Sequence, residues 1–293
     1  MAQVGAERHQ GACRSRRGQV GGVAFVSGEF GTWHHGLIAR WWSEFNVATP
    51  EELSYFGAAI RKFGEPVLDL GCGTGRIMFP LIGEGFDVDG ADISADMIAL
   101  AGAEAKKRGV SPRLTVQPMH ELNLGRKYRT IYICGSFGLG GRRDYDREAL
   151  IRAYEHLEPG GALLITHQNL PYDDDGKDWA QWLPSHRADL PGDWPAEGDR
   201  RTASDGDEIE TLFRVAELDP LAQRTTYQMR VRLFHDGQVV KEEDYDLRIN
   251  IYLVQEVLLM LHHAGFRDMA VEAGYTGRPA TRDDGMVSFV AIK

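Results

Sequence analysis

The sequence predicts an α/β fold in which a doubly wound, mostly parallel sheet is interrupted by an antiparallel β insert. Two patterns support this prediction. From residue 65 to 168, apolar runs of strand length alternate with amphipathic runs of helix length, as in successive βαβ units. From about 170 to 250, helical periodicity gives way to long stretches of alternating apolar and polar residues. We therefore expect one domain formed by residues 31–168 and 250–293, with an insert at 169–249.

Length, charge and cysteine content narrow the class of protein. The 293 residues suffice for one large core or two modest ones, and 43% hydrophobic residues is ordinary for a globular chain. The longest apolar run, YLVQEVLLML, is broken by Gln255 and Glu256 and is too short to span a bilayer. A formal charge of -10 disfavours nucleic acid as a partner. Cys13, Cys72 and Cys134 lie too far apart to indicate a disulfide framework or a zinc site, so we expect a cytoplasmic protein.

The first segments of the chain are predicted to be a tail and two helices. Residues 1–30 are rich in Gly and Arg, and we interpret them as a flexible tail, with a transit peptide as the weaker alternative. Across residues 33–45, large apolar side chains recur at spacings of three and four, which predicts a helix. A second helix is indicated by Pro50 at its first position, with Thr49 as N-cap and Glu52 completing a capping box.

Strands and helices then alternate up to the insert. Ser94 and Gly109 bound the helix SADMIALAGAEAKKR, as an N-cap residue and a terminating glycine. Asp236 and Gly237 separate two strands of the insert and predict a two-residue hairpin turn. After the insert, a helix (LVQEVLLMLHHAG) and two strands would complete the first sheet. In chain order, the elements expected before the insert are EPVLDL, RIMFPLIGEG, FDVDGAD, SADMIALAGAEAKKRG, RLTVQ, TIYICG, DREALIRAYEHL and ALLITH.

A glycine turn follows the first strand of this pattern. In VLDLGCGTGR, Gly71, Gly73 and Gly75 let the backbone approach a ligand, and the next helix offers unpaired N–H groups at its start. The NAD-binding fingerprint would place its third glycine at position 76, which is Arg76 here, so a dinucleotide is disfavoured. Asp92 ends the second strand, where a carboxylate can accept hydrogen bonds from both hydroxyls of a ribose.

The segment from Asp69 to Gly75 resembles, position for position, the first motif of the class I S-adenosylmethionine-dependent methyltransferases. The resemblance implies S-adenosyl-L-methionine as the cofactor and a Rossmann-like, seven-stranded sheet whose last strand is antiparallel. It also implies a cofactor site at the ends of the first four strands. The residues expected in this site are Asp69, Gly71, Gly73, Gly75, Asp92, Ile93, Gln117, Met119, His120 and Gly135.

The resemblance carries further expectations for the adenine and for the cofactor carboxylate. Pro118 occupies the position where members of the family often have an acidic residue for the adenine amine. Adenine recognition would then rest on the backbone N–H of His120 or Met119 and on the side chain of Gln117. The N-terminal helix of the family folds over the cofactor, so that Arg40 would meet its carboxylate while a tryptophan closes the site. The alternative is that this helix only packs its aromatic side chains on the sheet.

The acceptor is expected to be a small molecule methylated at nitrogen or oxygen. The insert resembles the accessory β-layer of small-molecule members of the family, which covers the entrance for the acceptor. His167, at the end of the fifth strand, is the candidate general base, with a structural hydrogen-bonding role as the alternative. Residues 169–172, NLPY, resemble the NPPY motif of nucleic-acid adenine methyltransferases, but they follow the fifth strand instead of the fourth. Residues 178–194, rich in tryptophan, are expected to be either a lid over the pocket or a contact that pins the insert to the main domain.

Other functions stay open at this point. The main alternative is a scaffold or sensor that binds S-adenosylmethionine without transferring its methyl group. An NAD-linked oxidoreductase is disfavoured by Arg76 and by the lack of a recognisable hydride-transfer residue. We expect no metal site, a monomer or homodimer, and Cys134 in a buried, small apolar role.

Overall fold

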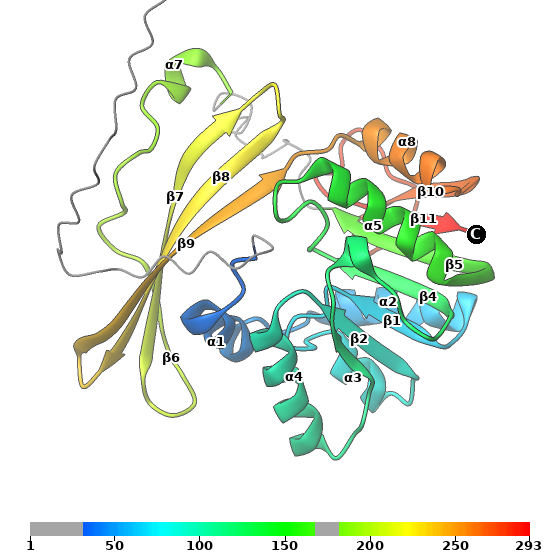
Figure 1. The fold of residues 1–293 in the computed structure, drawn as a ribbon, viewed down its shortest axis with the longest axis horizontal. Helices are drawn as coiled ribbons and strands as arrows, with labels where there is room; N and C mark the ends of the chain where they lie inside the picture. The colour runs from blue at the N-terminus through cyan, green and yellow to red at the C-terminus, as the bar shows by residue number, and fades with distance from the viewer. Residues whose placement is uncertain (1–31, 168–181) are drawn as a thin grey trace, which may run out of the picture.

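The computed structural model describes residues 32–167 and 182–293. The tail expected at 1–30, with its transit-peptide alternative, and the NLPY segment at 169–172 lie outside the described residues. The same holds for the beginning of segment 178–194, up to residue 181. Two sheets of different size dominate the described part of the chain, and helices pack around the larger one (Figure 1).

The larger sheet contains seven strands, which are β1 (Val67–Leu70), β2 (Val88–Asp92), β3 (Leu114–Val116), β4 (Tyr128–Cys134), β5 (Leu157–His167), β10 (Asp268–Ala273) and β11 (Val287–Ile292). Their order in space is β10-β11-β5-β4-β1-β2-β3. The pairs among β1 to β5 are all parallel, whereas β11 is antiparallel to both of its neighbours, β5 and β10. This confirms the predicted seven-stranded, mostly parallel sheet with an antiparallel last strand.

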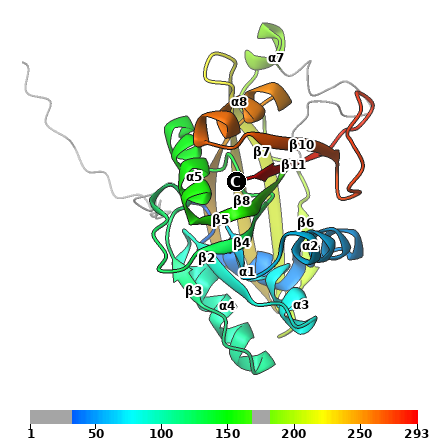
Figure 2. The ribbon, with the colours of Figure 1, turned by 90° about the vertical axis from the view of Figure 1, so that its right-hand side faces the viewer.

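Helices lie on both faces of this sheet. They are α2 (Pro50–Phe63), α3 (Met78–Gly83), α4 (Ala95–Arg108), the short 3-10 helix η1 (Met119–Glu121), α5 (Arg143–His156) and α8 (Val254–Ala264), whereas α1 (Gly36–Phe45) packs on the insert. One apolar cluster joins α5 and α8 to the sheet through Leu150 and Leu261, and a second joins α2, α3 and α4 through Phe56, Met78 and Ala101. In Figure 2, α5 and α2 lie on opposite sides of the strands. Within the described ranges, no helix is long and apolar enough to cross a membrane.

Side-chain caps set the starts of α2 and α4, as predicted. The Thr49 hydroxyl accepts the N–H of Glu52, and the Glu52 carboxylate accepts the N–H of Thr49, which confirms the capping box. Ser94 accepts the N–H of Met97 at the start of α4, and Gly109 ends that helix with a φ of 68°. Both helix boundaries are therefore fixed by hydrogen bonds within their own short segments.

The insert forms a separate, antiparallel sheet between β5 and α8. Its four strands, adjacent in this order, are β6 (Asp199–Thr202), β7 (Glu208–Asp219), β8 (Arg224–His235) and β9 (Gln238–Asn250). The predicted turn between β8 and β9 is confirmed, with positive φ angles of 49° at Asp236 and 74° at Gly237. The inner face of this sheet packs on the aromatic side chains of α1 through Met229, Val231 and Tyr245. Figure 1 shows α1 between the two sheets.

The outer face of the insert sheet is charged and receives part of the tryptophan-rich segment. Arg230 pairs with Asp244 across β8 and β9 at 2.8 Å. Trp194, which follows the short helix α7 (Pro184–Arg187), lies 4.7 Å from the Arg230 guanidinium and 4.4 Å from that of Arg214. Trp194 therefore packs on the outer face of the insert itself, and these contacts match neither a lid nor a contact that pins the insert to the main domain.

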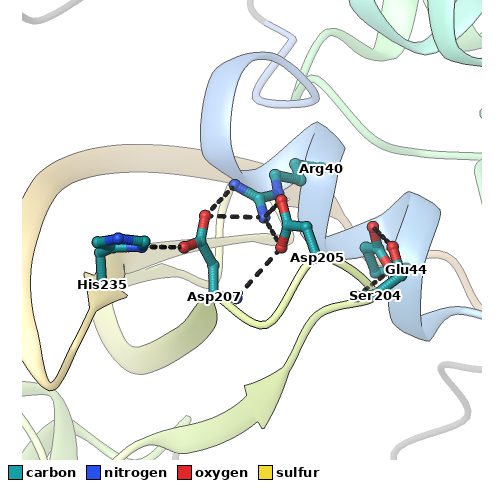
Figure 3. Close-up of polar contacts among 6 residues, drawn as sticks. All are labelled: Arg40, Glu44, Ser204, Asp205, Asp207 and His235. Atoms are coloured by element: carbon teal, nitrogen blue, oxygen red, sulfur yellow. Dashed lines mark hydrogen bonds and ion pairs between the residues drawn. The ribbon is translucent and has the colours of Figure 1, made fainter.

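A cluster of polar contacts, which we call the clasp, ties α1 to the insert (Figure 3). Arg40 of α1 donates to Asp205 at 2.7 Å and to Asp207 at 3.1 Å, both in the turn between β6 and β7. His235 lies 2.8 Å from the second of these carboxylates. The members of the clasp are Arg40, Glu44, Ser204, Asp205, Asp207 and His235. This corrects the expectation that Arg40 meets the cofactor carboxylate, because its guanidinium is held by the insert.

Candidate active site

A cavity of about 590 Å³ lies between the larger sheet and the insert. Its walls come from the glycine turn after β1, the ends of β2 and β4, η1, α1 and the inner face of β7 and β9. Open α/β sheets bind ligands at the carboxyl ends of their strands, and ligand cavities commonly measure about 300–1,000 Å³. The predicted cofactor residues that line this cavity are Gly71, Gly73, Asp92, Ile93, Met119, His120 and Gly135.

Four predicted cofactor residues do not line the cavity, and three of them contact other parts of the chain instead. Arg40 belongs to the clasp. The Gln117 side chain accepts the N–H of Asn123 at 3.0 Å, which corrects the expectation that it reads the adenine. Gly75 faces α3, where a Cβ would lie 2.5 Å from the ring of Phe79, so this glycine allows the turn to pack on the helix. None of the three lines the cavity in the described part of the chain.

The first two glycines of the turn form the floor of the cavity. Gly71 has a φ of 83°, and a Cβ there would lie 2.3 Å from Ser136 Oγ and 2.6 Å from Met119 Cε. Gly73 has a φ of 54° and nothing within 4 Å of its Cβ position, so it opens directly onto free space. Both angles lie in the left-handed region that glycine adopts without strain. The turn thus exposes backbone to a ligand, which fits close binding of an S-adenosylmethionine tail.

Asp92 places a buried carboxylate in the cavity wall at the end of β2. It accepts the N–H of Gly73 and the N–H of Ser94, each at 2.8 Å. Burial raises the pKa of Asp92 above its ordinary value, although these backbone N–H groups act in the opposite direction. Each carboxylate oxygen has capacity for further hydrogen bonds. A ribose diol is therefore a chemically suitable partner for this side chain.

Asp69 lies below the turn, outside the cavity wall. It is buried near the hydroxyl of Tyr132, and burial raises its pKa to about 7 from an ordinary value of 3.8. The Tyr132 hydroxyl and the Arg76 guanidinium favour the ionised form, whereas the charge of Asp92 disfavours it. Asp69 therefore interacts with Tyr132 inside the sheet and does not line the cavity.

The expected adenine region contains an aromatic stack that the sequence did not reveal. Met119 and His120, on η1, line the cavity as predicted residues. The His120 ring stacks on Tyr145 of α5, with ring centroids 3.6 Å apart and planes 9° apart. Burial lowers the pKa of His120, so the ring is neutral, and its Nε2 has no hydrogen-bond partner among the described residues. The stack gives this end of the cavity a flat side, and the guanidinium of Arg142, another lining residue, lies 4.0 Å from the centroid of the Tyr145 ring.

A buried ion pair lies beside the glycine turn. Arg76, which also lines the cavity, donates to both oxygens of Glu52 at 2.7 and 2.9 Å. Its guanidinium lies 3.2 Å from the sulfur of Cys134, and the Tyr275 hydroxyl donates to Glu52 at 3.1 Å. Cys134 packs against the apolar cluster of α2 and α3 but also contacts these polar groups, and burial raises the pKa of its thiol. Arg76 is neutralised by Glu52 and brings no free positive charge to the cavity.

The segment before α1 and α1 itself close one side of the cavity. Trp33, His34 and Trp42 line it, so tryptophan side chains lie where one was expected to close the site. Burial and the neighbouring His35 lower the pKa of His34 to about 4, so this side chain is neutral near pH 7. The two tryptophan rings pack edge to face with centroids 6.0 Å apart.

An apolar wall stands opposite the glycine turn. It is made by Leu139, from the loop after β4, and by Phe213, Leu247 and Ile249 on the inner face of the insert. Leu139 and Ile249 form an isolated antiparallel bridge, which joins the loop to β9. Phe213 keeps 47% of its surface exposed, which is unusual for a phenylalanine in a sheet face and leaves it free to contact a ligand. The backbone of His167 pairs with Val287, and the side chain of this candidate base lies outside what the structure describes.

Asp146 is the most informative residue that the sequence analysis missed. It lies on α5, lines the cavity and is only 8% exposed. A signal was present, because Asp146 shares a helical face with Ala149, Leu150 and Ala153, all of which are buried. An acidic residue on a buried helix face indicates a specific polar environment.

Known proteins share both the sequence motif and the fold. Residues 67–161 match the family described as a methyltransferase domain. A Geobacillus protein, itself named as a methyltransferase by inference only, is 26% identical over 266 residues, which cover 87% of this chain and 98% of the relative. A glycine/sarcosine N-methyltransferase of Halorhodospira halochloris is 31% identical over 140 residues, covering 46% of this chain and 52% of the relative.

Two solved structures show how widely the fold agrees. An S-adenosylmethionine-dependent methyltransferase from Clostridium acetobutylicum has a TM-score of 0.65 at 16% identity, covering 87% of this chain and 97% of the other. A sugar N-methyltransferase from Streptoalloteichus sp. has a TM-score of 0.65 at 17% identity, covering 94% and 99%. Residues 67–161 therefore match a methyltransferase domain, and the described part of the chain has the fold of an S-adenosylmethionine-dependent methyltransferase of class I. Its methyltransferase domain begins at β1 and includes the glycine turn.

Proposed function

We propose that the protein transfers a methyl group from S-adenosylmethionine to a nitrogen or oxygen atom of a small-molecule acceptor. The observation that carries this proposal is the apolar wall of Leu139, Phe213, Leu247 and Ile249, which faces the glycine turn across the cavity. Because the inner face of the insert closes this side, the space beside the cofactor suits a small molecule. The names of similar proteins, a sugar N-methyltransferase and a glycine/sarcosine N-methyltransferase, agree with an acceptor of this size.

Within this proposal the residues of the cavity have separate roles. Gly71 and Gly73 present backbone to the amino-acid tail of the cofactor, and Asp92 accepts the ribose hydroxyls. Met119 and His120 flank the adenine from η1.

Bound S-adenosylmethionine supplies a methyl group on a sulfonium sulfur. An acceptor lone pair attacks the methyl carbon in line, and the sulfur leaves as the thioether of S-adenosylhomocysteine. The chain contributes mainly by alignment and by exclusion of water, and alignment of this kind can lower a barrier by about 7–11 kcal/mol. Trp33 and Trp42 cover the cavity on the side of α1, and the insert covers it on the other side. A general base is needed only for an acceptor that must lose a proton, and His167 remains the proposed candidate.

Calorimetric titration with S-adenosylhomocysteine and, in parallel, with NAD tests the cofactor assignment. We expect only the thioether to bind. Asp92→Ala should weaken that binding by about 1.5–3 kcal/mol, because hydrogen bonds to a charged group are lost. Glu104→Gln, which removes one carboxylate from the partly exposed surface of α4, is the matched control and should bind normally. Binding of NAD without the thioether would refute the assignment.

Release of S-adenosylhomocysteine during incubation with panels of amines and alcohols tests the transfer reaction. We expect release to depend on at least one small acceptor, with methylation detected on the acceptor by mass spectrometry. Cofactor binding without release on any member of broad panels would favour the scaffold or sensor alternative.

A further inference from the structure

Asp146 is a buried carboxylate that the proposed transfer reaction leaves unexplained. Its Oδ2 accepts hydrogen bonds from Asn250 Nδ2 at 2.7 Å and from the Tyr252 hydroxyl at 2.6 Å. Both donors belong to the segment in which the chain leaves β9, so they hold the carboxylate at the junction of α5 and the insert. Its Oδ1 accepts no hydrogen bond from residues 32–167 or 182–293, and the side chain lines the cavity.

No cation in the described part of the chain pairs with Asp146. The adjacent Arg143 donates to Glu256 at 2.6 Å and otherwise to backbone carbonyls. Arg142 pairs with Asp144 at 2.6 Å. Burial raises the pKa of Asp146, although the hydrogen bonds from Tyr252 and Asn250 and the nearby charge of Arg143 act in the opposite direction. A buried carboxylate without a cation is unfavourable unless something else supplies charge or hydrogen bonds, and a ligand in the cavity can do so.

The other basic residues that line the cavity do not favour an acidic acceptor, because each is paired or neutral. Arg76 is bound through two hydrogen bonds by Glu52. His34 and His120 are neutral, because burial lowers the pKa of each. Arg142 also lines the cavity and pairs with Asp144, so each arginine among the described lining residues already has a carboxylate partner.

The surroundings of the acceptor space are apolar. The apolar wall of Leu139, Phe213, Leu247 and Ile249 lines the same cavity as Asp146. Leu139 and Ile249 are bridged, and Ile249 directly precedes Asn250, which donates to Asp146. One acidic group at the edge of an apolar wall is complementary to an amine on an apolar skeleton.

We propose, resting on the proposed function, that the acceptor is an amine on an apolar skeleton without an acidic group, and that Asp146 holds its amino group. The free Oδ1 accepts an N–H of the amine, and the apolar wall takes up the skeleton. A zwitterionic amino acid such as sarcosine is then a poor acceptor, because each arginine among the described lining residues already has a carboxylate partner.

Calorimetry on the complex with S-adenosylhomocysteine tests this assignment, with benzylamine as the probe. Benzyl alcohol matches the probe without its positive charge, and benzoate and sarcosine carry an acidic group. We expect benzylamine to bind at least about tenfold more tightly than the other three, as loss of a buried charged hydrogen bond would give. Equal binding of all four compounds, or tighter binding of benzoate, would overturn the assignment.

Asp146→Asn is the matching substitution, because its amide oxygen can still accept from Asn250 and Tyr252 while its NH₂ group faces the cavity. We expect it to weaken benzylamine binding by about tenfold or more. Glu148→Gln, on the exposed side of the same helix, is the control and should not weaken it.

Cofactor affinity, measured on the same variants, separates this inference from the proposed function. Binding of S-adenosylhomocysteine should be unchanged in Asp146→Asn. If that binding falls while benzylamine binding stays normal, the carboxylate serves the adenine amine of the cofactor and our assignment is wrong. Failure of the unaltered protein to bind S-adenosylhomocysteine would instead count against the proposed function itself.

Discussion

Replacement of Gly71 by alanine tests whether the close approach of the turn to the loop after β4 shapes the cavity. The new Cβ would lie 2.3 Å from Ser136 Oγ, about 1 Å inside ordinary van der Waals contact. Its φ of 83° adds a left-handed strain of about 1–2 kcal/mol for a residue with a side chain. Overpacking of this kind costs about 1–3 kcal/mol, so we expect a total loss of about 2–5 kcal/mol in the free energy of unfolding.

Chemical denaturation and calorimetry with S-adenosylhomocysteine measure the two consequences. Gly71→Ala should lower the unfolding midpoint and weaken cofactor binding by about tenfold, since Gly71 lines the cavity. Adding Ser136→Gly removes the overlapping atoms, so the double variant should recover the overpacking part while the φ strain remains. If Gly71→Ala retains the stability and affinity of the unaltered protein, our account of the turn is refuted.

Three further predictions concern residues around the cavity. Glu52→Gln breaks the buried pair with Arg76 and should lower the free energy of unfolding by about 3–5 kcal/mol in urea, whereas the exposed Glu51→Gln should change it little. Arg40→Ala removes half-exposed ion pairs worth about 0–1 kcal/mol and should leave the calorimetric affinity for S-adenosylhomocysteine unchanged. Asp69→Asn should gain stability relative to the unaltered protein as the pH rises from about 4 to about 7.

The sign of the last prediction follows from the two states of the carboxyl group. The pKa of Asp69 is raised to about 7 in the folded protein from an ordinary value of 3.8, so folding favours its protonated form. Its contribution to stability is full below about pH 4 and is lost as the pH rises to about 7. Parallel pH profiles for both proteins in urea unfolding would contradict this.

A marked fall in cofactor affinity in Arg40→Ala would contradict the prediction for that variant and indicate that Arg40 contacts the cofactor.

Local hydrogen-bonding signals in the sequence predicted local structure well. The capping box of Thr49 and Glu52 and the turn at Asp236 and Gly237 each depend on residues within a few positions, so a short window contains the whole interaction. The antiparallel direction of β11 followed only from the resemblance, and its position between β5 and β10 was not predicted. No short segment specifies which distant strand will be its neighbour.

The same difference between local and distant contacts explains which site residues were predicted correctly. Gly71 and Asp92 were predicted because a strand end and a turn bring them to one edge of the sheet. Arg40 was misplaced because its partners lie on the insert, more than 160 residues away in the chain. Asp146 went unnoticed because its donors come from the end of β9, more than 100 residues later. Contacts of such separation depend on the tertiary fold, and the sequence indicates only the buried helix face on which Asp146 lies, not its partners.

The place of β11 in the larger sheet has a consequence for synthesis on the ribosome. Val287 at the start of β11 pairs with His167 at the end of β5, and 120 residues separate the two. At about 5–20 residues per second, translation of that interval takes about 6–24 s, during which this edge of β5 has no partner in its own sheet. An open apolar strand edge can pair with other chains. Nascent copies of this enzyme should therefore depend on chaperones until the last strand emerges and closes the gap.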